Sequence, residues 1–91
     1  MQISYDEAKR QWTLENRGLD FADAVQVFED VHVVQEDDRR PYPEPRLLTY
    51  GFLKGRLVMF AFTPTKEGIR VFSMRKCNVR EQRKFDHWVG R

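Results

Sequence analysis

Residues 46–63, RLLTYGFLKGRLVMFAFT, carry the strongest signal for the fold of this chain. Most of its residues are apolar, aromatic or β-branched, which is the composition typical of strands. Lys54-Gly55 near the middle is typical of a tight turn. The stretch therefore predicts a hairpin of two antiparallel strands, Arg46–Phe52 and Arg56–Thr63.

Further strands are predicted on both sides of this hairpin. Residues 64–68 form a turn signal, and Ile69–Met74 predicts the next strand, while Val31–Gln35 predicts a strand that precedes the hairpin. Residues 36–45 contain three prolines among charged residues, so we expect an exposed loop there. The four strands in sequence predict an antiparallel meander.

Three helices are predicted outside the strands. Residues 5–16 predict a helix in which Tyr5 and Trp12, at helical spacing, are expected to be core residues rather than base-stacking platforms, and Gly18 suits the end of the helix. Asp20 is expected to cap a second short helix that ends near Asp30. The third helix, 78–89, is expected to bury one apolar face made of Val79, Phe85, Trp88 and Val89.

This order, α-α-β-β-β-β-α, predicts an α+β domain in which the helices pack on one face of an antiparallel meander sheet. Residues 1–91 are expected to form a single domain.

Composition excludes several classes of protein. Only one cysteine is present among 91 residues, which excludes an intramolecular disulfide and a Cys-rich zinc site. His32 and His87 lack any metal-ligand spacing, and the glycines are too scattered to form a phosphate loop. Without a signal peptide or an apolar run of ~20 residues, we expect a cytoplasmic protein that uses no membrane, metal or cofactor.

Charge is distributed unevenly along the chain. Residues 1–45 hold five Lys and Arg against eleven Asp and Glu, whereas residues 46–91 hold eleven against three, which makes the two halves −6 and +8. This asymmetry predicts a basic surface built by the second half, whose natural partner is a polyanion.

The densest basic run, residues 73–84, lies where the last strand ends and the last helix begins. Its cations are expected to converge on one rim, where a helix N-terminus also favours phosphate: Arg75, Lys76, Arg80 and Lys84. RNA supplies its own nucleophile, the 2′-hydroxyl, so cleavage needs a base, an acid and cations for the phosphate charge. Glu81 is the available base, and His87 is a candidate acid.

Each of these residues also has a structural interpretation. Glu81 can act only as the N3 residue of a capping box with Asn78, and the basic helix face can be an ordinary solvated surface. Cys77 is expected to pack rather than act as a nucleophile. Composition alone therefore supports a polyanion-binding domain and stops short of an enzyme.

Several motifs follow one another in a characteristic order. They are Tyr5-Asp6-Glu7-Ala8-Lys9 with Asn16 and Gly18, FADAVQVFED over residues 21–30, Arg46…Gly51…Gly55-Arg56, and RVFSMRK over residues 70–76 followed by Glu81. Over roughly residues 3–88 this set resembles the BrnT toxins, the ribonucleases of bacterial type II toxin–antitoxin modules. The sequence departs from that family at Arg17, where the family often has histidine.

The resemblance implies a RelE-like fold and a metal-independent endoribonuclease that inhibits translation. The implied functional residues are Arg75, Lys76 and Glu81, together with Arg80 and Lys84. We further expect RNA contacts from Arg46, Arg56, Arg70, Arg83 and His87. The implied partner is a BrnA-type antitoxin whose ribbon-helix-helix domain binds DNA, in a two-plus-two assembly.

Two alternatives to the ribonuclease stay open from the sequence. One is a non-catalytic nucleic-acid-binding or co-repressor module of the same fold, which would bind RNA or DNA in a salt-sensitive way and leave it intact. The other is a structural interaction domain, which would show neither binding nor cleavage.

Overall fold

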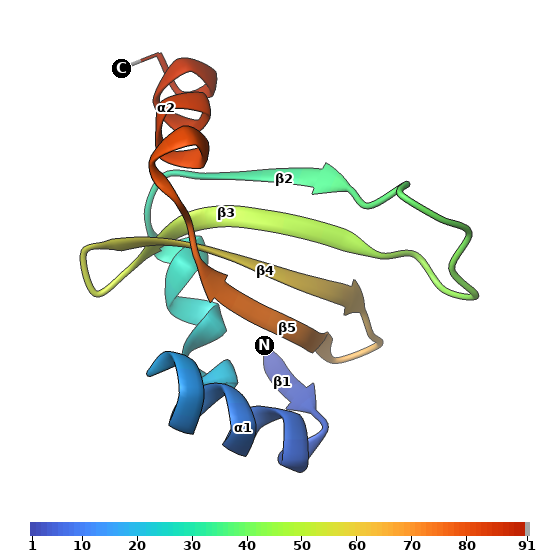
Figure 1. Ribbon diagram of the computed structural model, residues 1–91. Helices are drawn as coiled ribbons and strands as arrows, with labels where there is room; N and C mark the ends of the chain where they lie inside the picture. The colour runs from blue at the N-terminus through green and yellow to red at the C-terminus, as the bar shows by residue number, and fades with distance from the viewer. Residues whose placement is uncertain (91) are drawn as a thin grey trace.

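A five-stranded sheet in the order β1-β5-β4-β3-β2 forms the centre of the computed structural model, which describes residues 1–90 (Figure 1). The elements in chain order are β1 (Gln2–Tyr5), α1 (Glu7–Arg17), η1 (Phe21–Glu29), β2 (His32–Glu36), β3 (Leu47–Leu53), β4 (Arg56–Pro64), β5 (Gly68–Lys76) and α2 (Val79–Trp88). Thus the mixed α+β class is confirmed. Among residues 1–90, no helix is long and apolar enough to cross a membrane.

Strands β2 to β5 form the predicted antiparallel meander, with their ends within about two residues of the expected positions. The β3–β4 turn is formed by Lys54 and Gly55, whose φ angles of 51° and 81° are those of a two-residue hairpin turn with both central residues left-handed. The prediction from residues 46–63 is therefore confirmed.

Strand β1 corrects the predicted topology. Residues 2–5 pair parallel to β5, in register with residues 68–71, so the sheet is mixed rather than purely antiparallel. The strand begins the chain, and Tyr5 belongs to it instead of to the first helix. Its backbone lies so close to Gly68 that a Cβ there would stand 2.0 Å from the Gln2 carbonyl oxygen. A four-residue strand whose partner is distant in sequence has no local signal.

The ends of the first two helices are capped, and Gly18 and Asp20 act as predicted. Asp6 accepts a hydrogen bond from the Lys9 amide at the start of α1, and Gly18 ends it with φ 67°. Asp20 caps η1, which is a 3-10 helix rather than an α-helix. The exposure of Trp12 is a correction: its side chain is 53% exposed, so it is not a core residue.

Helices cover both faces of the sheet, which corrects the prediction of a single covered face. Helices α1 and η1 lie on one face, and α2 stands against the other at one end of the sheet (Figure 1). The central strand β4 serves both cores: Val58, Phe60 and Phe62 face η1, whereas Leu57, Met59 and Ala61 face α2. Because β4 is buried on both sides, its sequence shows no alternation that would separate the two faces.

Helix α2 packs through one deeply buried residue, Phe85, whose ring meets that of Phe52 edge-on at 5.5 Å. The predicted apolar face is only partly buried, because Val79 is 60% exposed and Trp88 is 40% exposed. On the same side of the sheet, the part beyond α2 is left without a helix. This uncovered part, which is lined by Arg46, Arg70 and Arg75, is called the open face below.

The proline-rich loop is less exposed than predicted. The Asp37 side chain is fully buried and pairs with Arg39 at 2.7 Å, and the Tyr42 hydroxyl donates a hydrogen bond to the same carboxylate. Arg39 holds the pKa of Asp37 at about 2. These contacts hold the loop together, and the Asp37 amide donates to the Arg46 carbonyl at 2.8 Å, next to the start of β3.

Candidate functional site

An ion pair joins the end of β5 to the start of α2. Arg75 donates two hydrogen bonds to Glu81, from Nη1 to Oε1 at 2.8 Å and from Nη2 to Oε2 at 2.7 Å. The backbone explains why the two side chains meet: Glu81 is the N3 residue of the α2 capping box, where Asn78 holds it beside the last residues of β5. The sequence predicted both the capping box and a functional role for this pair of residues, and the structure brings the two side chains together.

The pair leaves Arg75 accessible. Its side chain is 39% exposed, against 18% for Glu81. A guanidinium has five N–H groups, and two of those of Arg75 are used by Glu81 and one by the Lys76 carbonyl at 3.4 Å. The remaining donors are available to an anion on the open face.

Glu81 is held in its charged form. Hydrogen bonding from Arg75, followed by the Asn78 amide and the charges of Arg75 and Lys84, lowers the pKa of Glu81 from 4.5 to about 2 against the opposing effect of burial. A carboxylate with so low a pKa is a weak proton acceptor. The arrangement therefore suits Glu81 to orient Arg75 better than to serve as a general base.

We expect the ion pair to make stability depend on acid pH. Because the pKa of Glu81 is lower in the folded protein than its ordinary 4.5, its stabilising contribution is present above about pH 4.5 and is lost as the pH falls toward about 2. Thermal melting of wild type and Glu81→Gln from pH 7 to pH 3 tests this. The melting temperature of the wild type should fall further, because only the wild type has the Glu81 carboxylate to lose. Asp37, whose pKa is also low, contributes equally to both proteins. Parallel curves would contradict the expectation.

Cross-strand register shows what surrounds Arg75. Arg75 lies opposite Met59, which lies opposite Tyr50, and all three point to the α2 side of the sheet. The Tyr50 ring packs edge-on against Trp88 at 5.4 Å. Burial, and then the nearby charge of Glu81, raise the pKa of Tyr50, so its hydroxyl keeps its proton at neutral pH. Tyr50 is a hydrogen-bond donor that the sequence analysis did not single out.

Two of the predicted RNA contacts lie on this same face. Arg70 lies between Ile69 and Val71, which face the η1 core, so its side chain points to the α2 side. Arg46 stacks on Phe72 and Tyr42, with its guanidinium carbon 4.0 Å and 4.3 Å from the two ring centres. Arg46, Arg70 and Arg75 therefore line the open face.

The other predicted residues lie elsewhere. Lys76 is opposite Val58 and so faces the η1 side, away from Arg75. Arg80, Lys84 and His87 follow one exposed stripe of α2, with Arg83 beside it. Arg56 has a structural contact: its Nη2 donates a hydrogen bond to the Cys77 carbonyl at 3.0 Å and so links the start of β4 to the segment between β5 and α2. The predicted convergence of all four cations on one rim is thus wrong for Lys76, since successive residues of a strand face opposite sides.

Cys77 is a packing residue, as expected. Its side chain is 1% exposed, and burial raises the pKa of its thiol to about 11, so the thiolate is scarce at neutral pH. Within residues 1–90, no three His, Cys, Asp or Glu side chains gather as a metal site would require.

Family comparison now identifies the kind of protein. A family model described as the ribonuclease toxin BrnT of type II toxin–antitoxin systems matches residues 5–81. The chain belongs to the BrnT family. Family membership makes it a ribonuclease toxin with an RNA target and a protein antitoxin as its partner. No curated protein sequence matches the chain.

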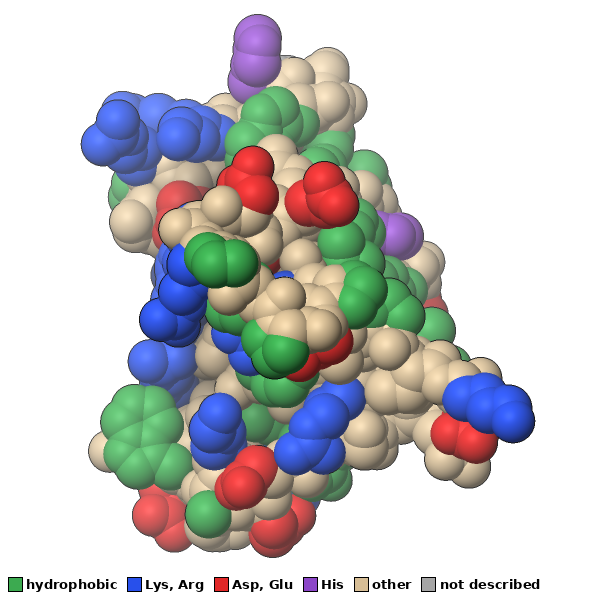
Figure 2. Space-filling view, turned by 90° about the vertical axis from the view of Figure 1, so that its right-hand side faces the viewer, with side chains coloured by type: hydrophobic (Ala, Val, Ile, Leu, Met, Phe, Trp, Pro, Cys, Tyr) green, Lys and Arg blue, Asp and Glu red, His purple; other side chains and the backbone are tan. Residues whose placement is uncertain are grey.

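The BrnT match ends at Glu81, so it includes the Arg75–Glu81 pair and leaves most of α2 outside. In the view of Figure 2, Lys and Arg side chains gather along the left side of the molecule, and further Lys, Arg, Asp and Glu side chains are spread over the rest of the surface.

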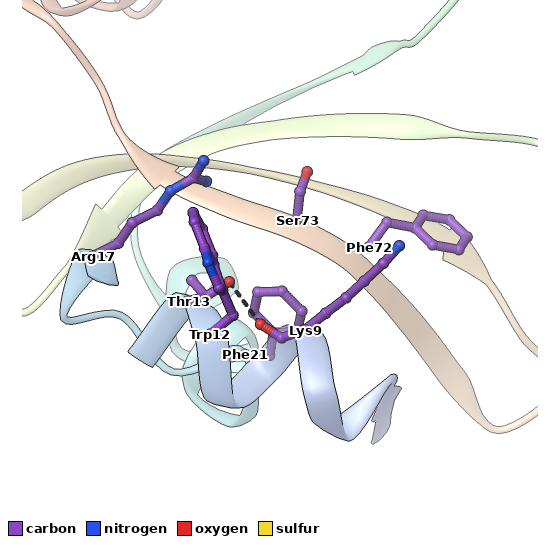
Figure 3. A pocket seen from close by; sticks show the side chains of 7 residues that line it. All are labelled: Lys9, Trp12, Thr13, Arg17, Phe21, Phe72 and Ser73. Carbon is purple, nitrogen blue, oxygen red and sulfur yellow. Dashed lines mark hydrogen bonds between the residues drawn. The ribbon is translucent and has the colours of Figure 1, made fainter. Parts of the chain in front are cut away.

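A pocket of about 200 Å³ lies at the lower end of this BrnT fold, between α1 and the edge of β5 (Figure 3). Its walls include Lys9, Trp12 and Arg17 from α1, and Phe72 and Ser73 from β5. The sequence did not predict this pocket, because the helical spacing of Trp12 favours a core position. The residues around Trp12 in α1 are mostly polar, and this was the signal that Trp12 is exposed. In the structure, Thr13 is the one buried residue of α1.

Proposed function

We propose that this protein is a metal-independent endoribonuclease that cleaves RNA by attack of the 2′-hydroxyl on the adjacent phosphate and thereby inhibits translation. The observation that supports the proposal is the bidentate Arg75–Glu81 pair on the open face, in a chain that belongs to a family of ribonuclease toxins. Residues 1–91 act as one toxin domain.

Arg75 binds the scissile phosphate in this proposal. Its side chain is 39% exposed, and the phosphate is bound by the N–H groups that Glu81 and the Lys76 carbonyl leave unused, so that negative charge on a phosphorane is stabilised by a cation that needs no rearrangement. Glu81 is the positioning residue, because its two hydrogen bonds fix the plane of the guanidinium. Arg46 and Arg70 lie on the same face and bind flanking phosphates.

The remaining predicted residues extend this surface. Arg80, Lys84, Arg83 and His87 on α2 meet the RNA backbone next to the cleavage site. Lys76 and Arg56 are outside this face, and we propose no contact with the scissile phosphate for them. Tyr50, which keeps its proton, is suited to donate a hydrogen bond to the phosphate or to the leaving oxygen.

The proposed partner is a BrnA-type antitoxin with a ribbon-helix-helix domain, in a two-plus-two complex that binds DNA only through the antitoxin. Family membership supports a protein antitoxin. The cationic open face supports an inhibitor that covers Arg75 with acidic or apolar groups, since occluding the phosphate site is the direct way to stop such an enzyme.

The experiment incubates a long RNA in EDTA with purified protein freed of its partner, beside Glu81→Gln. We expect discrete cleavage by the wild type, with 2′,3′-cyclic phosphate ends. Glutamine retains the capping position but not the charge, so a positioning role predicts cleavage about tenfold slower. If Glu81 were instead the base, cleavage would be lost and the pH–rate profile would lose its acid limb.

Three results would contradict the proposal. Cleavage that needs added Mg²⁺ would contradict metal independence, and products with 5′-phosphate ends would contradict 2′-hydroxyl attack. RNA that is bound with a steep salt dependence and remains intact would favour the non-catalytic binding module.

A further inference from the structure

The pocket between α1 and β5 has no role in the cleavage chemistry just described, yet it holds an aromatic side chain in an unusual setting. Trp12 is 53% exposed, although apolar side chains of this size usually bury more of their surface. Arg17 lies against its ring, with the guanidinium carbon 5.0 Å from the ring centre. The indole is therefore exposed and at the same time held in place.

Arg17 is itself fixed by the sheet. Strand β1 pairs with β5 only as far as Val71, so the following residues of β5 have no strand beside them on that edge. Arg17 donates from Nη1 to the Met74 carbonyl at 2.8 Å on this unpaired stretch. The stack of Arg17 on Trp12 is thus anchored to β5 at the Met74 carbonyl, which belongs to the peptide bond between Met74 and Arg75.

Charge on the pocket side of α1 is positive. Figure 3 shows Arg17 on one side of Trp12 and Lys9 extending on the other side toward Phe72. The acidic residues of α1 are engaged elsewhere, because Glu7 pairs with Arg10 at 2.8 Å and Glu15 accepts from Gln11 at 3.0 Å. A ligand beside Trp12 therefore meets an indole ring between two cations.

One wall residue of the pocket points to the same side of the sheet as Arg75. Ser73 forms part of its wall, and Ser73 lies opposite Ala61 on the same side of the sheet as Arg75. Ser73 and Arg75 are two positions apart along β5, with Met74 between them, which is a distance of about 7 Å. Adjacent nucleotides of one RNA strand can cover that distance.

We propose that this pocket is a nucleobase subsite for single-stranded RNA, in which Trp12 stacks on a base near the nucleotide whose phosphate Arg75 binds. Lys9 and Arg17 contact the phosphates on either side of that base. A ring flanked by cations is the arrangement that single-strand-binding surfaces use. The cavity of about 200 Å³ is smaller than that of a drug-sized ligand, which suits one planar base. This inference rests on the proposed function, since it places an RNA strand across the open face.

Trp12 can be observed directly, because the chain has only two tryptophans and Trp88→Phe leaves Trp12 as the single one. In that variant we expect fluorescence quenching when a 2′-O-methyl oligouridine hexamer, which resists cleavage, is added. An abasic sugar–phosphate hexamer should bind through its phosphates and leave the fluorescence unchanged. Equal quenching by both probes, or by neither, would overturn the inference.

Affinity provides a second test in the otherwise unaltered chain. Trp12→Ala should weaken binding of the same hexamer about tenfold, as loss of one base–aromatic contact does, and Trp12→Phe should restore most of it. The matched control is Leu14→Ala, an exposed apolar residue of α1 that is not part of the pocket wall. Thermal melting verifies that each variant is folded.

The outcomes separate this inference from the proposed function. If Arg75→Ala weakens RNA binding and Trp12→Ala does not, the base subsite is wrong and the proposed function stands. If wild type binds no RNA at all, both fail. A change in Trp12 fluorescence caused by a protein antitoxin and not by RNA would assign the pocket to the antitoxin and overturn the subsite.

Discussion

Replacing Arg75 with alanine is expected to lower the rate of RNA cleavage by about 100-fold or more while the protein stays folded. The size follows from removing a preorganised donor to a charge that develops in the transition state. Arg75 lies on the α2 side of the sheet, where Glu81 holds its guanidinium by two hydrogen bonds and its side chain stays 39% exposed. Single-turnover cleavage of a defined RNA measures the effect.

Two further variants show whether geometry or charge is responsible. Arg75→Lys keeps the positive charge but cannot make the planar two-point contact with Glu81, so we expect most of the activity to be lost. Lys66→Ala removes one positive charge from an exposed turn remote from α2 and should cleave at the wild-type rate. If Lys66→Ala lowered the rate as much as Arg75→Ala, general electrostatic attraction of RNA would explain the loss.

Arg75→Ala also leaves Glu81 without its partner. The pKa of Glu81 should then rise toward its ordinary 4.5, and the carboxylate would repel a phosphate on the open face. The double variant Arg75→Ala/Glu81→Gln removes that repulsion. We expect it to bind RNA better than Arg75→Ala and to remain as slow in cleavage, because repulsion affects binding and the missing donor affects the transition state.

Replacing Phe85 with alanine is expected to have the largest effect on stability, lowering the free energy of unfolding by about 3 kcal/mol or more. Phe85 is fully buried and is the only buried residue of α2. Its ring packs edge-on against Phe52 and belongs to the core of Leu48, Leu57 and Met59. Without that ring, little apolar surface would keep α2 against the sheet.

Chemical denaturation and amide exchange measure this effect together. Exchange should speed up first in α2, and cleavage should fall because Glu81 would no longer be held beside Arg75. Val79→Ala is the matched control on the same helix, since Val79 is 60% exposed and should cost little. Equal losses in the two variants would show that α2 is held by its caps and charges rather than by Phe85.

Much of the candidate site was predictable from local sequence. The Asn78–Glu81 capping box is a four-residue signal, and it places Glu81 at the N3 position wherever the helix lies. Arg75 was predicted from the basic run. Lys76 was wrongly grouped with it, because the linear run does not reveal that the strand continues to Lys76 and sends neighbouring side chains to opposite faces.

Tyr50 and the Trp12 pocket were not predicted. Tyr50 is placed on the same face as Arg75 by two cross-strand pairings, Tyr50 with Met59 and Met59 with Arg75. The register of strand pairing brings these residues together, and no sequence motif connects them. Trp12 was misassigned because helical spacing shows which residues share a face but not whether another element covers that face.

Local sequence accounts for the separate elements and for the kind of chemistry. The apolar composition and the Lys54-Gly55 turn produce the β3–β4 hairpin, polar caps set where α1 and α2 begin, and the ordered motifs indicate the BrnT family. Three features appear only in the folded chain: β1 pairs parallel with β5, α2 packs on the face opposite η1, and Arg75 meets Glu81. The difference lies in the sequence separation of the contacts involved. Turns and caps are completed within a few residues. Strand pairing and the choice of a sheet face depend on contacts between segments that are distant in sequence, such as the hydrogen bond from Ser4 to the Ile69 carbonyl.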